Sequence, residues 1–154
     1  MPSPKTASPK SQRPIRQSKI QDLKSKIALV YSVFWVVLAI APFDRSDWLL
    51  ENLLVFVTAA FLLATHRRLQ LSDLSYVFIA VFLTLHAIGA HYTYEHVPLG
   101  DWLRAPLGFR RNHFDRIVHF AFGLLLTYPL AEALHRMIKV AWKWAGAFSF
   151  AIVL

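Results

Sequence analysis

The chain contains no cysteine, and only 17% of its 154 residues are charged. Without thiols, a disulfide, a catalytic cysteine and a thiolate metal site are all excluded, whereas the redox compartment of the protein stays open. Soluble domains carry about 25% charged residues. This chain is instead 56% apolar, with a mean hydropathy of +0.41. The composition therefore argues against both a disordered chain and an ordinary cytosolic enzyme.

Positive charge is concentrated at the N-terminus. The chain has 17 Lys and Arg against 9 Asp and Glu, and seven of those bases but only one of the acids lie in residues 1–26. This segment has little apolar surface, so it predicts a disordered basic tail attracted to anionic lipid. It also lacks any aromatic residue on which bases could stack, so no nucleic-acid partner is expected.

Long apolar stretches predict an all-α, polytopic transmembrane helix bundle over residues 27–154. A helix needs about 20 apolar residues to cross the hydrocarbon core of a bilayer. Four stretches come close to that length, and a fifth begins before the chain ends; they cover residues 27–43, 48–65, 74–94, 117–134 and 144–154. The fifth is too short to cross, so we expect four full spans in a C-terminally truncated chain, with a short interfacial fifth segment as the alternative.

The first stretch has a second interpretation as a cleaved secretory signal. Ala39-Ile40-Ala41 resembles the small-residue site at which such signals are cut. Pro42 directly after that site and the long tail before the apolar core both fit a signal poorly. We therefore favour a retained membrane anchor.

Basic residues beside the spans predict the orientation. Twelve of the 17 bases lie in the tail and in the two loops on its side of the membrane, which are the loop with Arg67 and Arg68 and the loop with Arg136, Lys139 and Lys143. Cytoplasmic loops retain Lys and Arg, so the N-terminus is expected in the cytoplasm. The loop of residues 95–116 then lies outside, and its middle predicts either a short amphipathic lid on the outer surface or a plain connection.

Ionisable side chains within the spans are the candidates for function, because they are costly in lipid. The third and fourth spans are antiparallel if both cross, so the end of one lies at the depth of the start of the other. Pairs four residues apart share a helix face, as His91 does with Glu95 and Asp115 with His119. Together with Glu51 from the second span, these considerations predict a polar cluster near the outer face: His86, His91, Glu95, Asp115 and His119.

Three chemistries fit this cluster. Imidazoles and carboxylates can bind a divalent metal ion that activates water, and they can relay protons. They can also recognise an envelope lipid or a small solute, with anion-binding arginines nearby at Arg110, Arg111 and Arg116. No nucleophile stands beside a base, so whether the protein is an enzyme stays open.

Purely structural roles for the same residues remain alternatives. Asn112 and Asp115 suit the N-terminus of the fourth span, where Asp115 can serve only as part of a helix cap. His119 can simply hydrogen-bond to a neighbouring helix. In that case the protein is a membrane scaffold without a catalytic site.

Three segments of the chain resemble the YjdF-like family of bacterial inner-membrane proteins. They lie at residues 41–48, 89–100 and 111–120, and the resemblance extends over roughly residues 27–154. Its most specific strings are His91-Tyr92-Thr93-Tyr94 and Arg111-Asn112-His113-Phe114-Asp115-Arg116. The resemblance implies a multi-pass inner-membrane protein of undetermined activity. Members continue with a further helix that this sequence does not contain, which also implies truncation. Asp115-Arg116-x-x-His119-Phe120 is similar, more weakly, to a signature of VanZ-like membrane proteins.

Overall fold

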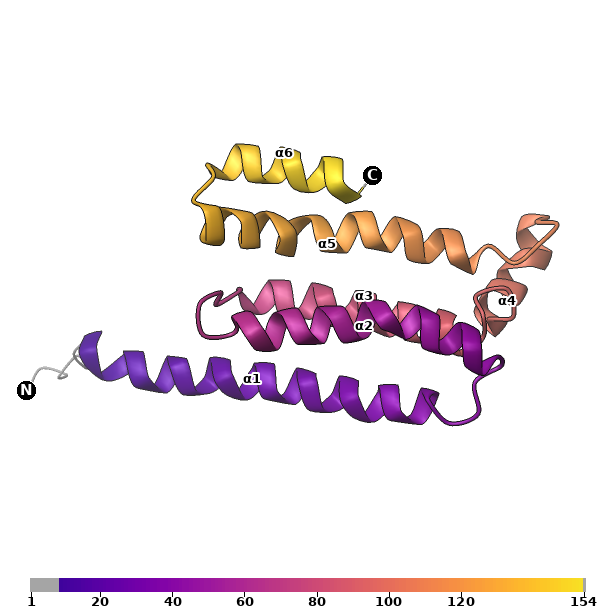
Figure 1. Cartoon of the computed structure of the whole chain (residues 1–154), viewed down its shortest axis with the longest axis horizontal. Coiled ribbons are helices and arrows are strands. Elements are labelled where there is room, and N and C mark those ends of the chain that lie inside the picture. Colours follow the sequence, from indigo (N-terminus) through magenta and orange to yellow (C-terminus); the bar gives the residue numbers. More distant parts are fainter. Residues whose placement is uncertain (1–8, 154) are drawn as a thin grey trace, which may run out of the picture.

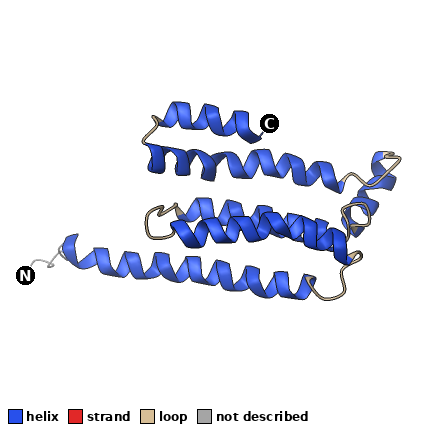
Figure 2. Cartoon of the chain, viewed as in Figure 1, coloured by secondary structure: helices blue, strands red, loops and turns tan. Residues whose placement is uncertain are grey.

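The computed structural model describes residues 9–153, and every element in that range is a helix (Figure 2). The helices are α1 (Pro9–Leu38), α2 (Arg45–Thr65), α3 (Asp73–His91), α4 (Pro98–Leu107), α5 (Phe114–Ile138) and α6 (Trp142–Val153). All except α4 run side by side along the long axis of the molecule (Figure 1). The predicted all-helical class is confirmed, whereas several predicted boundaries differ.

The first helix differs from its expected limits at both ends. α1 begins at Pro9, so residues 9–26 of the expected disordered tail are helical, and residues 1–8 lie outside the described part of the chain. Residues 15–26 contain no proline or glycine and are rich in good helix formers, which allows the helix to extend. At the other end, the helix stops at Leu38 instead of residue 43. The backbone of Ala41 has φ 48°, and Pro42 disfavours helix at the residue before it.

Side-chain caps set the starts of α2 and α3. The Asp44 carboxylate accepts hydrogen bonds from the backbone N–H groups of Ser46 and Asp47, at 2.8 and 2.9 Å. Ser72 caps α3 by accepting from the Ser75 N–H. These caps satisfy amide groups that otherwise have no partner at a helix start.

Three helices of the described chain are long and apolar enough to cross a membrane: α2, α3 and α5. The four full spans expected from the sequence are thus not all present by this measure. Only residues 27–38 of the first predicted span are helical, a rise of about 18 Å, so α1 reaches the ~30 Å of the core only together with part of its N-terminal half. α6, with 12 residues, is similarly short.

α3 lies at the centre of the bundle and packs against α1, α2 and α5, while α6 packs on the outer side of α5. Its buried face includes Phe82, Leu83 and the small residues Ala87 and Ala90. The outward faces of α1 and α2 are instead apolar and exposed; Leu50 and Leu63, for example, keep over 70% of their surface. Such faces suit a hydrocarbon solvent, in which apolar surface need not be hidden.

Three connections meet at one end of the bundle, the right-hand end in Figure 1. They link α1 to α2, α3 to α4 and α4 to α5. The first two are joined by a hydrogen bond from the Phe43 N–H to the His91 carbonyl at 2.9 Å and by stacking of Phe43 on His96. The bundle therefore has one end built from several loops, and the candidate site lies there.

Candidate functional site

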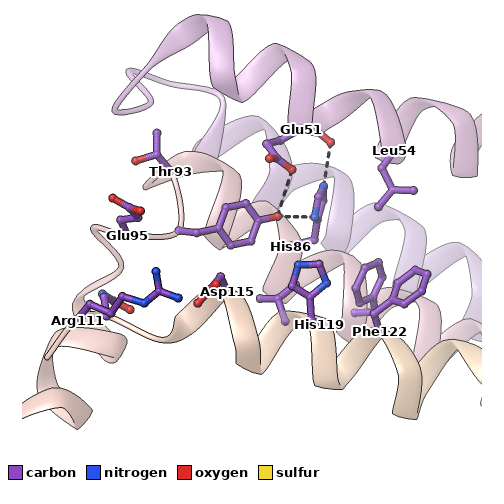
Figure 3. A pocket seen from close by; sticks show the side chains of 13 residues that line it. Glu51, Leu54, His86, Thr93, Glu95, Arg111, Asp115, His119 and Phe122 are labelled. Atoms are coloured by element: carbon purple, nitrogen blue, oxygen red, sulfur yellow. Dashed lines mark hydrogen bonds between the residues drawn. The ribbon is translucent and has the colours of Figure 1, made fainter. Parts of the chain in front are cut away.

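A cavity of about 480 Å³ opens between α2, α3 and α5 at the loop-rich end. Figure 3 shows polar side chains at its loop side and aromatic side chains deeper along α5. The apolar part of the wall consists of Leu54, Phe82, Val118 and Phe122. The polar part consists of Glu51, His86, Thr93, Tyr94, Glu95, Arg111, Asn112, Asp115 and His119.

The structure brings together four of the five residues of the predicted cluster. His86, Glu95, Asp115 and His119 all line the cavity, as does Glu51. They meet because α3 runs opposite to both α2 and α5, so the start of α2, the end of α3 and the start of α5 share one level. Glu95, Arg111 and His119 are exposed, so the cavity is open to the surroundings.

His91 does not belong to the cavity, contrary to the sequence prediction. Its Nδ1 is 2.8 Å from the carbonyl oxygen of Leu38 and donates to it at the C-terminus of α1. Five residues separate His91 from His86, a rotation of about 140° around a helix, so the two rings leave α3 in different directions. His91 thus fastens α1 to α3 by capping an otherwise free helix carbonyl.

The expected helix-face pairing of His91 with Glu95 is also absent. α3 ends at His91, and Tyr92 is its C-cap. Glu95 therefore lies in the following turn and reaches the cavity from the loop. The prediction placed Glu95 in the right region for the wrong reason, because it extended the helix to residue 94.

Only one of the three predicted anion-binding arginines lines this cavity, namely Arg111. Arg116 lines a separate, mainly apolar cavity of about 380 Å³ under α4, together with Leu103, Leu107 and Phe120. Arg110 lines neither. Three carboxylates, Glu51, Glu95 and Asp115, thus face one guanidinium across the main cavity.

A chain of hydrogen bonds links Glu51, Tyr94 and His86 at the cavity wall (Figure 3). The Tyr94 hydroxyl is 2.7 Å from Nδ1 of His86 and 3.4 Å from Oε2 of Glu51. Nε2 of His86 is 2.9 Å from the backbone carbonyl oxygen of Glu51 and donates to it. His86 is only 4% exposed, so its two ring nitrogens are held by neighbouring protein groups.

Sequence reasoning missed the role of Tyr94 in this cavity. The chain reverses after α3 with positive φ at Thr93 and Tyr94, 53° and 58°, and the Tyr94 ring folds back over Gly89. A Cβ atom at Gly89 would lie 2.3 Å from Cε1 of that ring. A glycine five residues before a tyrosine was the available signal. Non-glycine residues in this backbone region cost free energy and cluster at functional sites.

Burial raises the pKa of the Tyr94 phenol above its ordinary value, and the nearby Glu51 carboxylate raises it further. Tyr94 lies in the loop after α3, not within it. Its hydroxyl therefore stays protonated at neutral pH and is able both to donate and to accept a hydrogen bond.

The N-cap residue of α5 is His113, one residue after the Asn112 that the sequence suggested, but the Asn112 side chain still bonds to the first amide of the helix. Its Oδ1 accepts from the Phe114 N–H at 3.0 Å, and its Nδ2 donates to the Val97 carbonyl at 2.9 Å. Gly100 makes room for this amide, since a Cβ there would clash with it. The Asp115 carboxylate faces the cavity instead.

The described residues hold no group of three His, Asp or Glu side chains that could share one metal ion. A catalytic zinc site takes three protein ligands around one point. The donor arrangement in residues 9–153 thus gives the predicted divalent metal no support.

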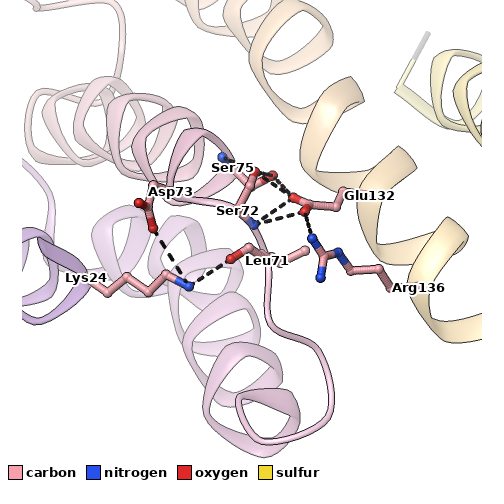
Figure 4. A network of polar contacts seen from close by, with 7 residues as sticks. All are labelled: Lys24, Leu71, Ser72, Asp73, Ser75, Glu132 and Arg136. Carbon is pink, nitrogen blue, oxygen red and sulfur yellow. Dashed lines mark hydrogen bonds and ion pairs between the residues drawn. The ribbon is translucent and has the colours of Figure 1, made fainter. Parts of the chain in front are cut away.

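A second polar cluster lies at the opposite end of α3 (Figure 4). The Glu132 carboxylate on α5 accepts from the backbone N–H and hydroxyl of Ser72 and from the Ser75 hydroxyl. Arg136 pairs with it at 2.7 Å. Nearby, Lys24 of α1 donates to the Leu71 carbonyl at 2.8 Å. The Glu132 contacts join α5 to the start of α3, and the Lys24 contact joins α1 to the loop before α3.

Comparisons with known proteins give one family and one curated relative. A family model described as "Predicted membrane protein (DUF2238)" matches residues 23–154. The inner membrane protein YjdF of Escherichia coli (strain K12) is 33% identical over 121 residues, which cover 79% of this chain and 58% of the relative. The chain thus spans little more than half the length of that relative. No solved structure matches.

Proposed function

Because the chain belongs to the DUF2238 family of predicted membrane proteins, and so is an integral membrane protein similar to an inner-membrane protein, we propose that its cavity binds an ammonium group. The group is carried either by a small solute or by a lipid headgroup. The single observation behind this proposal is the charge of the cavity wall, where three carboxylates face one guanidinium.

The shape of the cavity supports the same ligand. Its polar side lies at the loop-rich end of the bundle and its apolar side, with Phe82 and Phe122, extends along the helices. An ammonium headgroup can donate hydrogen bonds to the carboxylates while an attached chain lies on the apolar wall. Arg111 is placed to pair with an anionic part of the same molecule.

Binding measurements on purified protein test this proposal. We expect ethanolamine to bind the chain in phosphatidylglycerol nanodiscs, and Glu51→Gln or Asp115→Asn to weaken binding about tenfold, because each removes one charge-assisted hydrogen bond. Asp47→Asn is the matched control. It removes the same charge one turn before Glu51, on an exposed side chain outside the cavity, and should leave binding unchanged.

Arg111→Gln decides the sign of the preferred charge. An ammonium site should bind ethanolamine more tightly without this arginine, because a repulsive charge is removed. An anion site would instead lose its main partner, and stronger binding of inorganic phosphate than of ethanolamine to the original chain would overturn the proposal. Competition by phosphatidylethanolamine in the nanodisc distinguishes a lipid headgroup from a free solute.

We also propose that the cavity faces the outer side of the inner membrane and that α1 crosses the membrane as a fourth span. The N-terminal part of α1 extends past the ends of the other helices (Figure 1) and carries most of the bases of residues 1–26. Lys and Arg favour the cytoplasmic side, where anionic lipids attract them. The loops at the opposite end then lie outside.

A further inference from the structure

The buried ring of His86 has a defined hydrogen-bond arrangement. Nε2 faces the backbone carbonyl oxygen of Glu51 at 2.9 Å. A carbonyl only accepts, so Nε2 carries a hydrogen in either charge state of the ring. Nδ1, 2.7 Å from the Tyr94 hydroxyl, is therefore the nitrogen at which His86 gains or loses a proton.

The Tyr94 hydroxyl can serve His86 in two ways. When the ring is neutral, the hydroxyl donates its hydrogen to Nδ1. When the ring is protonated, Nδ1–H donates to the hydroxyl oxygen, and the hydroxyl hydrogen turns to Oε2 of Glu51, at 3.4 Å. Each arrangement satisfies both Tyr94 and His86, so the same atoms are compatible with both charge states.

From this geometry we propose that Glu51, Tyr94 and His86 form a proton relay between the cavity and the buried imidazole. In the forward step, protonated Glu51 gives the hydrogen of its carboxyl to the Tyr94 oxygen as the Tyr94 O–H bond breaks and its hydrogen joins Nδ1 of His86. The products are a Glu51 carboxylate, an unchanged Tyr94 phenol and a His86 imidazolium. One proton has moved, and no other reactant is required.

His86 lines the cavity wall, yet little of its ring is open to the cavity. His86 is 4% exposed, Phe82 stacks on its ring at 5.9 Å, and its two nitrogens face Glu51 and Tyr94. Glu51, by contrast, lines the open cavity. The relay ends at His86, because Nε2 donates to a backbone carbonyl that cannot pass a proton on. His86 is therefore a proton store coupled to the cavity.

The charged and titratable groups around the relay come from α2, α5 and the loops. Those that line the cavity with His86 are Glu51 from α2, Asp115 and His119 from α5, and Tyr94, Glu95 and Arg111 from the loops. None of the described side chains of α1 lines it.

The relay links protons to the ligand, and in this respect the inference rests on the proposed function. A proton on Glu51 removes one of the three carboxylates that face an ammonium group. Movement of that proton to His86 restores the Glu51 carboxylate but adds positive charge nearby. Binding of the ammonium group and loading of the relay therefore oppose each other.

Nuclear magnetic resonance of ¹⁵N-histidine-labelled protein in nanodiscs, without any ligand, tests the relay. The His86 signal is assigned by its loss in His86→Gln, and exchange of its ring hydrogen with water is measured in protonating buffer. We expect Tyr94→Phe to slow this exchange about 100-fold, because the transferring hydroxyl is removed while the ring that packs over Gly89 remains. Tyr92→Phe, which removes a hydroxyl from a residue two positions earlier, is the control and should exchange at the original rate.

Glu51→Gln provides a second variant that preserves the backbone carbonyl bound to Nε2. It should also slow the exchange, because an amide cannot release a proton as a carboxyl does. Unchanged exchange in both variants would overturn the relay. The exchange experiment contains no ligand, so its result is independent of the ammonium site. If exchange depends on Tyr94 but ethanolamine does not bind, the ammonium site alone is refuted. If ethanolamine binds but exchange does not depend on Tyr94 or Glu51, the relay alone is refuted.

Discussion

Tyr94 shows how one residue connects backbone strain with site chemistry. Its backbone and that of Thr93 have positive φ, and its N–H donates to the Gly89 carbonyl at 2.8 Å. The ring then lies over Gly89 with the hydroxyl between His86 and Glu51. The strained turn is stabilised by these contacts, and in return it places the hydroxyl within the cavity wall.

Gly89→Ala tests the close approach of the Tyr94 ring. The added methyl would overlap ring carbons that the turn cannot easily move, so we expect the free energy of unfolding to fall by about 1–3 kcal/mol. Unfolding in detergent, followed by circular dichroism, measures it. Gly123→Ala is the matched control, because a Cβ there meets nothing within 4 Å. It should stabilise α5 by up to about 1 kcal/mol, and equal losses in both variants would contradict the packing argument.

The pKa of Tyr94 predicts a loss of stability at alkaline pH. The folded chain holds this pKa above the ordinary value of about 10, so the neutral phenol is favoured by folding. Its contribution is fully present below pH ~10 and is lost as pH rises through the folded pKa. In Tyr94→Phe the free energy of unfolding should therefore fall less steeply above pH ~10 than in the original chain. Parallel pH profiles would show that Tyr94 does not titrate in this way.

At the scale of elements, Glu132 joins the start of α3 to the end of α5. Its carboxylate caps α3 from another helix, because it accepts the N–H of Ser72 in addition to two serine hydroxyls. A carboxylate at a helix N-terminus is also favoured by the helix dipole. This contact fixes the axial register of α3 against α5, on which the meeting of His86 and Asp115 at the other end depends.

Glu132→Ala should lower the free energy of unfolding by about 3 kcal/mol, because it leaves buried donors and Arg136 without their partner. The measurement is reversible unfolding in mixed micelles. Asp22→Asn breaks an exposed i,i+4 pair with Lys26 and should cost no more than about 0.5 kcal/mol. If both substitutions had the same small effect, Glu132 would not join the two helices.

At the scale of the whole molecule, one open question is which end of the bundle faces the cytoplasm. Because the chain has no cysteine, an introduced cysteine is the single thiol with which a maleimide can react. With a membrane-impermeant maleimide on intact spheroplasts, Asp101→Cys in α4 should be labelled, whereas Gln70→Cys before α3 should react only after lysis. Both residues are exposed. The reversed pattern would place the cavity on the cytoplasmic side and refute the orientation.

The sequence by itself determined that the protein belongs in a membrane, that it is all-helical, and at which end of the bundle its polar residues meet. These properties follow from local composition and from the alternating direction of successive spans, which needs no knowledge of contacts. Glu51, His86, Asp115 and His119 could be grouped on that basis alone.

Only the tertiary structure decided which of the neighbouring polar residues enter the cavity. The predicted third span continues to residue 94, yet α3 ends at His91, and Tyr94 gains partners on α2 and α3. The turn after α3 carries Glu95 into the loop, while His91 binds the end of α1. The contacts of Tyr94 with Glu51 and of His91 with Leu38 join residues more than 40 positions apart, and no local pattern contains them.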